Sequence, residues 1–147
     1  EGVYRSASVA AAAVAAHECG HALQHAFGYA PLRMRSALVP AVSFASKWMT
    51  WVLLAGFLLI NIFPHLLTIG VILYALTTLF AFISLPVEIN ASERAIAWLE
   101  HAGITDNQTS PMAASALRSA AYTYVVAALA SLGTLIYYLM ILMGRRN

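Results

Sequence analysis

"WMTWVLLAGFLLINIFPHLLTIGVILYALTTLFAFISLPV", residues 48–87, contains no aspartate, glutamate, lysine or arginine over 40 consecutive residues. One membrane-spanning helix needs about 20 apolar residues, so this stretch is long enough for two. Pro64 interrupts it near the middle, and a proline disfavours helix at the residue before it. We therefore expect a hairpin of two spanning helices, over about residues 43–62 and 66–87, with a turn at residues 63–65.

The rest of the chain is also poor in charge. Of its 147 residues, 61% are hydrophobic and 10% are charged, whereas a soluble domain carries about 25% charged residues. A third apolar run predicts a span over about residues 119–143, in a helix that starts near Ser110 as N-cap. The sequence thus predicts an all-α polytopic membrane protein with about three transmembrane helices, and lipid bilayer as its surroundings. A net charge of +2 without a long basic run argues against nucleic-acid binding.

Two further helices are expected outside the spans. Residues 6–28 can form a helix that Ser6 or Ser8 caps and that Gly28 and Pro31 end. A helix over about residues 88–102 can simply continue the second span. Cytoplasmic segments of membrane proteins carry more Lys and Arg than external ones, which places both helices in the cytoplasm. The cations on the predicted cytoplasmic side are Arg5, Arg33, Arg35, Lys47, Arg94 and Arg118, against Arg145 and Arg146 on the other.

His17, Glu18 and His21 spell H-E-x-x-H within the predicted helix over residues 6–28. At 100° per residue the two histidines lie about 40° apart on adjacent turns, so both imidazoles can reach one ion. Glu18 is rotated by about 100° from His17, too far to ligate the same ion but able to reach a water bound to it. Two histidine ligands beside a general base are the arrangement of zinc proteases. The alternative is an amphipathic helix that carries polar residues without a metal.

A catalytic zinc site needs a third protein ligand, and few carboxylates are available. Glu88 is favoured because it follows the second span at the membrane side predicted for His17 and His21. Glu93 is the next candidate. The alternative role for Glu88 is a negative charge at a helix N-terminus, worth about 0.3–1 kcal/mol. The complete set of carboxylate residues is Glu1, Glu18, Glu88, Glu93, Glu100 and Asp106.

Three segments together resemble a known family: "SVAAAAVAAHECGHALQHAFGYAPLRMRSALVP", "LPVEINASERAIAWLEHAGI" and "AASALRSAAYTYVVAALASL". They resemble the YugP-like neutral zinc metallopeptidases of bacterial membranes over nearly the whole chain. The resemblance implies one metallopeptidase domain over residues 1–147, multi-pass in the bacterial inner membrane, with its active site facing the cytoplasm. It implies Zn²⁺ as cofactor and a membrane-associated peptide or protein as substrate. Members of that family usually have an additional N-terminal membrane segment, so we expect this chain to lack one.

The segment from Glu88 to Ser92 also resembles the E-x-x-A-D pattern of the gluzincins, as in HtpX-like and CAAX prenyl proteases. On that resemblance Glu88 is the third zinc ligand, beside His17 and His21. The aspartate of the pattern would orient a ligand histidine, and Ser92 stands in its place. We expect Ser92 or Asn90 to orient the histidine through a neutral hydrogen bond.

Other residues of the metal helix have two interpretations each. Gln24 faces the same side as His17 and can hydrogen-bond a ligand, while His25 can assist the metal or lie exposed. Cys19 is rotated by about 200° from His17, which favours a packing role. The predicted function is hydrolysis of peptide bonds by a zinc-activated water with Glu18 as base. The alternative is a non-catalytic membrane scaffold or partner-binding protein with a structural or vestigial zinc site. The sequence does not decide whether the protein forms a homo-oligomer.

Overall fold

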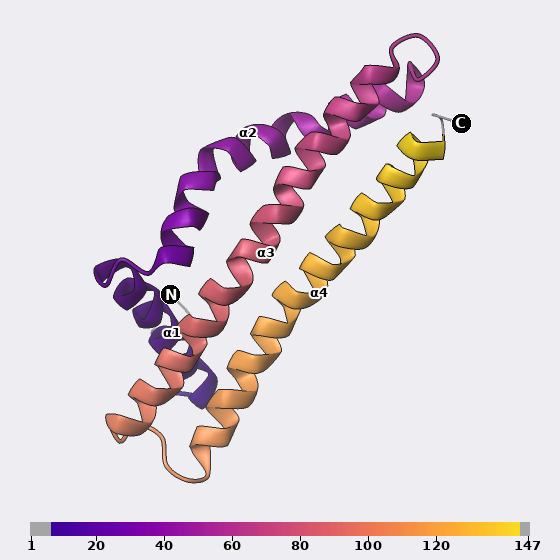
Figure 1. The fold of residues 1–147 in the computed structure, drawn as a ribbon. Helices are drawn as coiled ribbons and strands as arrows, with labels where there is room; N and C mark the ends of the chain where they lie inside the picture. Colours follow the sequence, from indigo (N-terminus) through magenta and orange to yellow (C-terminus); the bar gives the residue numbers. More distant parts are fainter. Residues whose placement is uncertain (1–6, 145–147) are drawn as a thin grey trace. The chain divides into compact units, whose positions relative to one another are not determined.

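Four helices follow one another along residues 7–144, the part of the chain that the computed structural model describes (Figure 1). Three of them, α2, α3 and α4, are long and apolar enough to cross a membrane. The prediction of an all-α protein with three membrane-spanning helices is therefore confirmed. Glu1, Arg5, Ser6, Arg145 and Arg146 entered the sequence interpretation and lie outside the described residues. The helices are α1 (Val9–Ala26), α2 (Ala30–Leu58), α3 (Pro64–His101) and α4 (Thr109–Gly144).

The ends of α1 follow from local chemistry. The side chain of Ser8 is the N-cap and accepts a hydrogen bond from the amide of Ala11 at 3.2 Å. Alanine, the best helix former, fills most of the first two turns. After Ala26 the chain leaves the helix, and Gly28 has a φ of +62°, a conformation that glycine adopts readily.

Two helices are longer than the sequence predicts. α2 starts at Ala30, well before the expected residue 43, and it includes Pro40. Pro31 lies in its first turn, where a missing N–H group costs no hydrogen bond. α3 starts at Pro64, so the expected turn at residues 63–65 ends earlier, and the helix continues through Pro86 to His101. The apolar span and the charged segment after it are therefore one helix.

The start of α4 also differs slightly from the prediction. The helix begins at Thr109, and Asp106 rather than Ser110 satisfies its first amide groups. One carboxylate oxygen of Asp106 accepts from the amides of Gln108 at 2.9 Å and Thr109 at 2.8 Å, and from the hydroxyl of Thr109 at 2.8 Å. These bonds lower the pKa of Asp106, first through the Thr109 side chain and then through the two amides.

The chain divides into two units, each with its own core. The first contains the described residues up to Met34 together with Ser84–Val125. Its helices α1, the end of α3 and the start of α4 pack through small side chains, which lets their backbones approach closely. The buried members of this core are Ala13, Ala16, Ala95, Leu99, Ala113 and Leu117.

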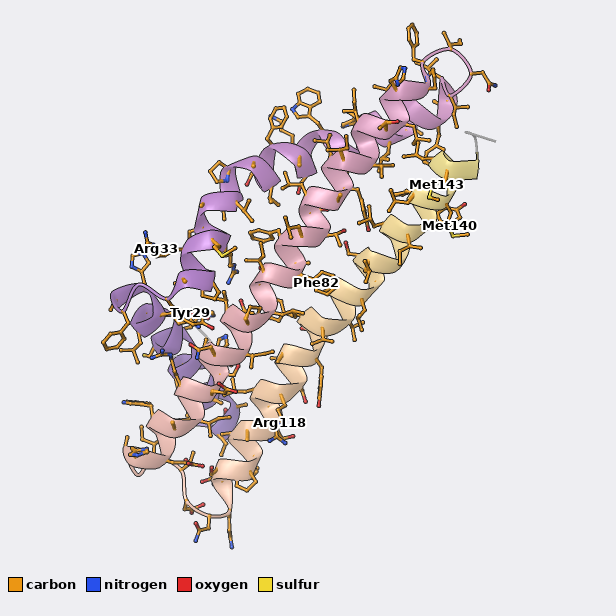
Figure 2. All side chains as sticks on the ribbon, in the orientation of Figure 1. Tyr29, Arg33, Phe82, Arg118, Met140 and Met143 are labelled. Carbon is orange, nitrogen blue, oxygen red and sulfur yellow. The ribbon has the colours of Figure 1, made fainter. Side chains whose placement is uncertain are left out.

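The second unit contains Arg35–Ile83 and the described residues from Val126 onward. Its buried cluster is Leu53, Leu67 and Val71, and the hydroxyls of Thr78 and Ser131 share a 2.6 Å hydrogen bond. Large apolar side chains point outward, with Met140 66% and Met143 67% exposed (Figure 2). An apolar exterior suits a unit whose helices span the hydrocarbon core of a bilayer.

Candidate metal centre

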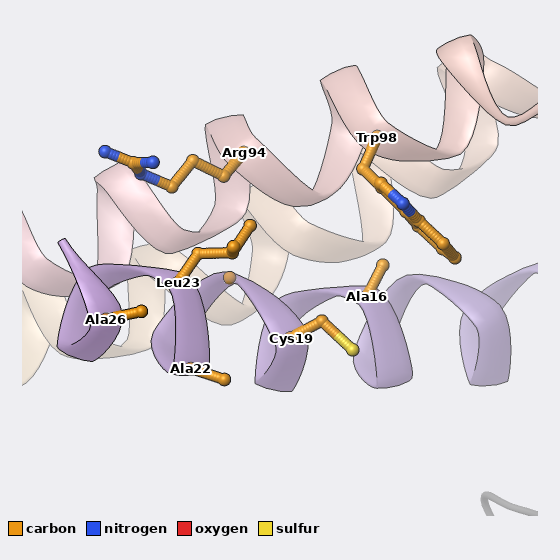
Figure 3. A pocket seen from close by; sticks show the side chains of 8 residues that line it. Ala16, Cys19, Ala22, Leu23, Ala26, Arg94 and Trp98 are labelled. Carbon is orange, nitrogen blue, oxygen red and sulfur yellow. The ribbon is translucent and has the colours of Figure 1, made fainter.

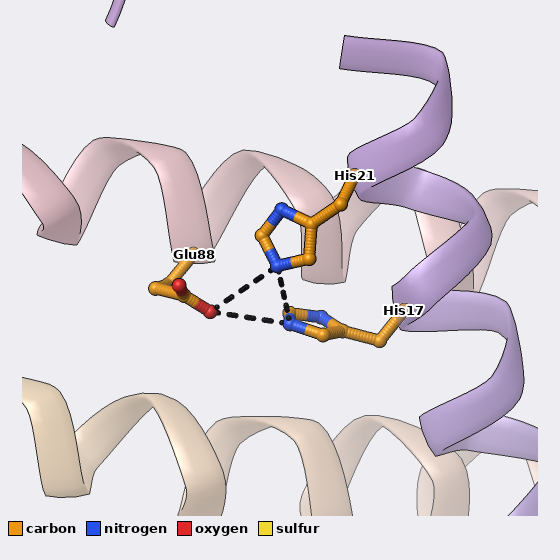
Figure 4. Close-up of side chains that lie close together, drawn as sticks. All are labelled: His17, His21 and Glu88. Atoms are coloured by element: carbon orange, nitrogen blue, oxygen red, sulfur yellow. Dashed lines mark hydrogen bonds and ion pairs between the residues drawn. The ribbon is translucent and has the colours of Figure 1, made fainter. Parts of the chain in front are cut away.

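Three side chains from two helices converge in the first unit (Figure 4). His17 and His21 come from α1, and Glu88 comes from α3, 71 residues after His17. The two Nε2 atoms of the histidines lie 3.1 Å apart. Oε2 of Glu88 lies 3.2 Å from Nε2 of His17 and 3.5 Å from Nε2 of His21. The structure thus brings together the three residues that the sequence suggests as metal ligands.

The close approach of α1 to α3 makes this convergence possible. Gly20, on α1 between the two histidines, is buried against the backbone of Ala91 on α3. A Cβ atom at Gly20 would lie 2.6 Å from the carbonyl oxygen of Ala91, a distance that side chains do not tolerate. The sequence interpretation did not include Gly20, although a glycine inside a helix is itself a signal of close packing.

The separations within the cluster suit a tetrahedral metal ion. Zinc binds histidine nitrogen and carboxylate oxygen at about 2.0–2.2 Å, so two ligand atoms on one tetrahedral ion lie about 3.3–3.6 Å apart. Of the three separations in the structure, 3.5 Å lies within that range, and 3.1 and 3.2 Å lie just below it. Two imidazoles and one carboxylate are also a donor set that zinc accepts. The residues present therefore fit a zinc ion.

The cluster is open on its histidine side. The side chain of Glu88 is 5% exposed, whereas those of His17 and His21 are 17% and 23% exposed. Three protein ligands with one accessible side are typical of catalytic zinc sites, because structural sites use four protein ligands.

Two buried polar residues hold the ligands from behind. Oγ of Ser92 lies 3.1 Å from Nδ1 of His17 and donates to the backbone oxygen of Glu88 at 2.9 Å. Oε1 of Gln24 lies 3.0 Å from Nδ1 of His21. Nε2 of Gln24 donates to the backbone oxygen of Val87 at 2.7 Å, which ties α1 to α3. Ser92 and Gln24 therefore touch one histidine each, on the ring nitrogen that faces away from the cluster.

Asn90 and Arg94 lie one step further out. Oδ1 of Asn90 accepts hydrogen bonds from Nε2 of Gln24 at 3.1 Å and from Nε of Arg94 at 2.8 Å. Asn90 therefore contacts a partner of His21 and not a ligand itself. The sequence interpretation used Arg94 only as a positive charge, because nothing in its local pattern indicates which side chain it meets.

The remaining candidates lie on exposed parts of α1 and α3. Glu18 is exposed, and its carboxylate has no hydrogen-bond or ion-pair partner among residues 7–144. His25 is exposed in the last turn of α1 and does not belong to the cluster of ligand atoms. Glu93 is also exposed.

Cys19 lies on the flank of α1 that faces away from the cluster. It lines an open apolar pocket of about 430 Å³ together with Leu23 of α1 and with Arg94 and Trp98 of α3 (Figure 3). Its thiol is exposed. Cys19 therefore does not contribute to the group of metal-ligating atoms.

Comparison with known proteins gives a family for this chain. Residues 1–143 match a protein family described as "Putative neutral zinc metallopeptidase". The chain is 40% identical over all its 147 residues to a Bacillus subtilis (strain 168) protein described as "Putative membrane protease YugP". It spans 64% of the length of that relative. No solved structure matches the chain.

Proposed function

The chain belongs to the family described as "Putative neutral zinc metallopeptidase", and from this premise we propose that it hydrolyses peptide bonds at a zinc ion held by His17, His21 and Glu88. The resemblance noted from the motifs is confirmed, and the protein is a membrane protein. The observation that carries the proposal is the convergence of three ligand atoms, all within 4.8 Å of one another, from helices far apart in the sequence. Their spacing and donor chemistry are compatible with a zinc ion and support this proposal.

In this proposal Glu18 is the general base. Zinc, when bound, would polarise the scissile carbonyl and lower the pKa of a bound water toward about 7. Glu18 follows His17 directly on α1 and is exposed, so its carboxylate is free to meet a water on the open side of the cluster. It takes a proton from the attacking water and delivers it to the leaving amine. His17, His21 and Glu88 keep their ligand atoms in place throughout.

The substrate in this proposal is a membrane-associated peptide or protein. Glu88 is the first charged residue after the 40 uncharged residues that contain the hairpin, so the site lies just beyond the apolar part of α3. Chains that emerge from the bilayer at this level would meet the open side of the cluster. The excess of Lys and Arg near this end supports a cytoplasmic site in the bacterial inner membrane.

The test compares three carboxylate variants of the full chain in lipid nanodiscs, measuring zinc content and cleavage of peptides. We expect Glu18→Gln to keep its zinc and lose at least about 100-fold in cleavage rate, since general-base catalysis contributes that much or more. We expect Glu88→Ala to lose zinc. Glu93→Gln is the matched control, because Glu93 is exposed and lies outside the cluster.

Two results would contradict the proposal. If Glu88→Ala retained its zinc, Glu88 would not be the third ligand. If Glu18→Gln cleaved peptides at an unaltered rate, Glu18 would not be the general base. If zinc also stayed bound in that variant, the result would favour the alternative of a non-catalytic scaffold.

A further inference from the structure

We propose that Arg94 is a positioning residue for the metal centre, acting on His21 through Asn90 and Gln24. The three residues form a chain of hydrogen bonds that starts at the guanidinium of Arg94 and ends at Nδ1 of His21. The inference rests on the proposed function only for the presence and identity of the metal.

Arg94 sets the direction of the first bond. A guanidinium group has donors and no acceptor, so the Asn90 atom that faces Nε of Arg94 at 2.8 Å must be the oxygen Oδ1. The same oxygen faces the amide of Gln24 at 3.1 Å. Since Oδ1 can only accept, the Gln24 atom that meets it must be the donor Nε2.

Val87 enforces the same orientation of Gln24 independently. Nε2 of Gln24 lies 2.7 Å from the backbone oxygen of Val87, which again can only accept. With both amide protons of Gln24 used in this way, its Oε1 is left to face Nδ1 of His21 at 3.0 Å. Gln24 is fully buried, so no bulk water competes for these bonds. Nδ1 of His21 must therefore be protonated, so the neutral imidazole keeps the lone pair of Nε2 for the cluster.

Ser92 fixes His17 in the same way. A serine hydroxyl has one proton, and Ser92 gives it to the backbone oxygen of Glu88 at 2.9 Å, because that oxygen cannot donate. Oγ of Ser92 then accepts from Nδ1 of His17 at 3.1 Å. When both imidazoles are neutral, they therefore present unprotonated Nε2 atoms to Oε2 of Glu88.

With neutral imidazoles, this arrangement brings three acceptor atoms within 3.5 Å of one another, and a cation between them would relieve their mutual repulsion. The partners behind the histidines, Gln24 and Ser92, are neutral and add no charge. Arg94 thus helps to prepare a cation site to which Glu88 contributes a negative charge.

The experiment measures zinc affinity by competition with a chelator, and the Nδ1–H signals of both histidines by ¹H–¹⁵N NMR of zinc-loaded protein in nanodiscs. We expect Arg94→Met and Asn90→Leu to weaken zinc binding by about 10- to 100-fold, the usual effect of losing a partner behind a ligand. Both variants should broaden or shift the Nδ1–H signal of His21 and leave the signal of His17 unchanged. Asn90→Asp keeps the accepting oxygen, so it should bind zinc like the wild type. Ser92→Ala should affect His17 instead, and Arg118→Met, at an exposed arginine, is the control.

The inference fails if Arg94→Met alters both histidine signals equally, or if Asn90→Asp is as damaging as Asn90→Leu. It also fails if Arg94→Met binds zinc like Arg118→Met. A wild-type chain that binds zinc but cleaves no peptide would contradict the proposed function and leave this inference standing, since neither measurement depends on cleavage. A wild-type chain that binds no zinc would overturn both.

Discussion

Replacing Gly20 by alanine tests whether the contact between α1 and α3 holds the metal centre together. Gly20 lies one turn before Gln24 and between both ligand histidines, with the backbone of Ala91 directly against it. The added Cβ would lie 2.6 Å from the carbonyl oxygen and 3.2 Å from the Cα atom of Ala91. Because these atoms belong to the helix backbone, they cannot rotate away as a side chain would.

The structure gives the size of the effect. Ordinary contact starts at 3.4 Å, so α1 and α3 must separate by up to 0.8 Å. The distance between Nε2 of His17 and Oε2 of Glu88, now 3.2 Å, would grow toward 4.0 Å, beyond the separation of two ligands on one zinc ion. Overpacking of this kind costs about 1–3 kcal/mol, and a loss of that size in the bound state is about 5- to 150-fold in zinc affinity.

The assay is zinc affinity by chelator competition, with thermal unfolding measured in parallel. The control is Gly133→Ala in α4, where an added Cβ meets nothing within 4 Å. That variant should keep its zinc affinity and gain up to about 1 kcal/mol of stability, since alanine is the better helix former. Gly20→Ala with the zinc affinity and stability of Gly133→Ala would refute the argument that this contact assembles the site.

Two further predictions concern packing and pH. Gly56→Ala should destabilise the second unit by about 1–3 kcal/mol in denaturant unfolding, because its Cβ would lie 2.7 Å from the backbone Cα of Leu67. Gly70→Ala should cost less, since its two nearest contacts, at 2.8 and 3.1 Å, are side-chain atoms of Leu53 and the backbone Cα of Leu53 lies 3.3 Å away; equal losses would contradict this reasoning. Asp106→Asn should lower the thermal stability of the protein above about pH 4, because the pKa of Asp106 is lower in the folded chain than its usual value of about 3.9. The stabilisation by the charged form is complete above that usual pKa and is lost as the pH falls through the lowered one, so the two proteins should converge in acid; a pH-independent difference would count against the cap.

The parts of the site that depend on local spacing could be predicted from the sequence. His17 and His21 are four residues apart on one helix, and that spacing alone places their rings together, with centroids 4.6 Å apart. Glu88 could be suggested because carboxylates are scarce in a chain with six acidic residues. The cap by Asp106 was missed although an acidic residue before a helix is a recognised start signal.

The parts that depend on how α1 crosses α3 could not be predicted. The role of Gly20 follows from its contact with Ala91 on α3, and that of Arg94 from its hydrogen bond with Asn90, one turn earlier on the same helix. The sequence pattern of α1 or of α3 alone does not show how the two helices are aligned against each other. The early start of α2 was missed because Pro31 was interpreted only as the end of the preceding helix, and the span was placed from the apolar run alone. Pro31 instead lies in the first turn, where no amide partner is lost, and the helix tolerates Pro40.

The chemistry of the first unit links its stability to its site. The core residues that α1 contributes there are Ala13 and Ala16. Each buries a side chain of one carbon atom, and one buried CH₂ group is worth about 0.8 kcal/mol, so their contribution to the stability is small. The attachment of α1 to α3 therefore depends strongly on polar ties, above all the bond from Gln24 to the backbone of Val87. A metal held by His17, His21 and Glu88 would be a further tie between the same two helices. Its binding energy would then count as stability of the unit, about 2.7 kcal/mol at a free concentration 100 times the Kd. Because Gly20, Gln24 and Glu88 lie at this one contact, substitutions there should change metal affinity and stability together.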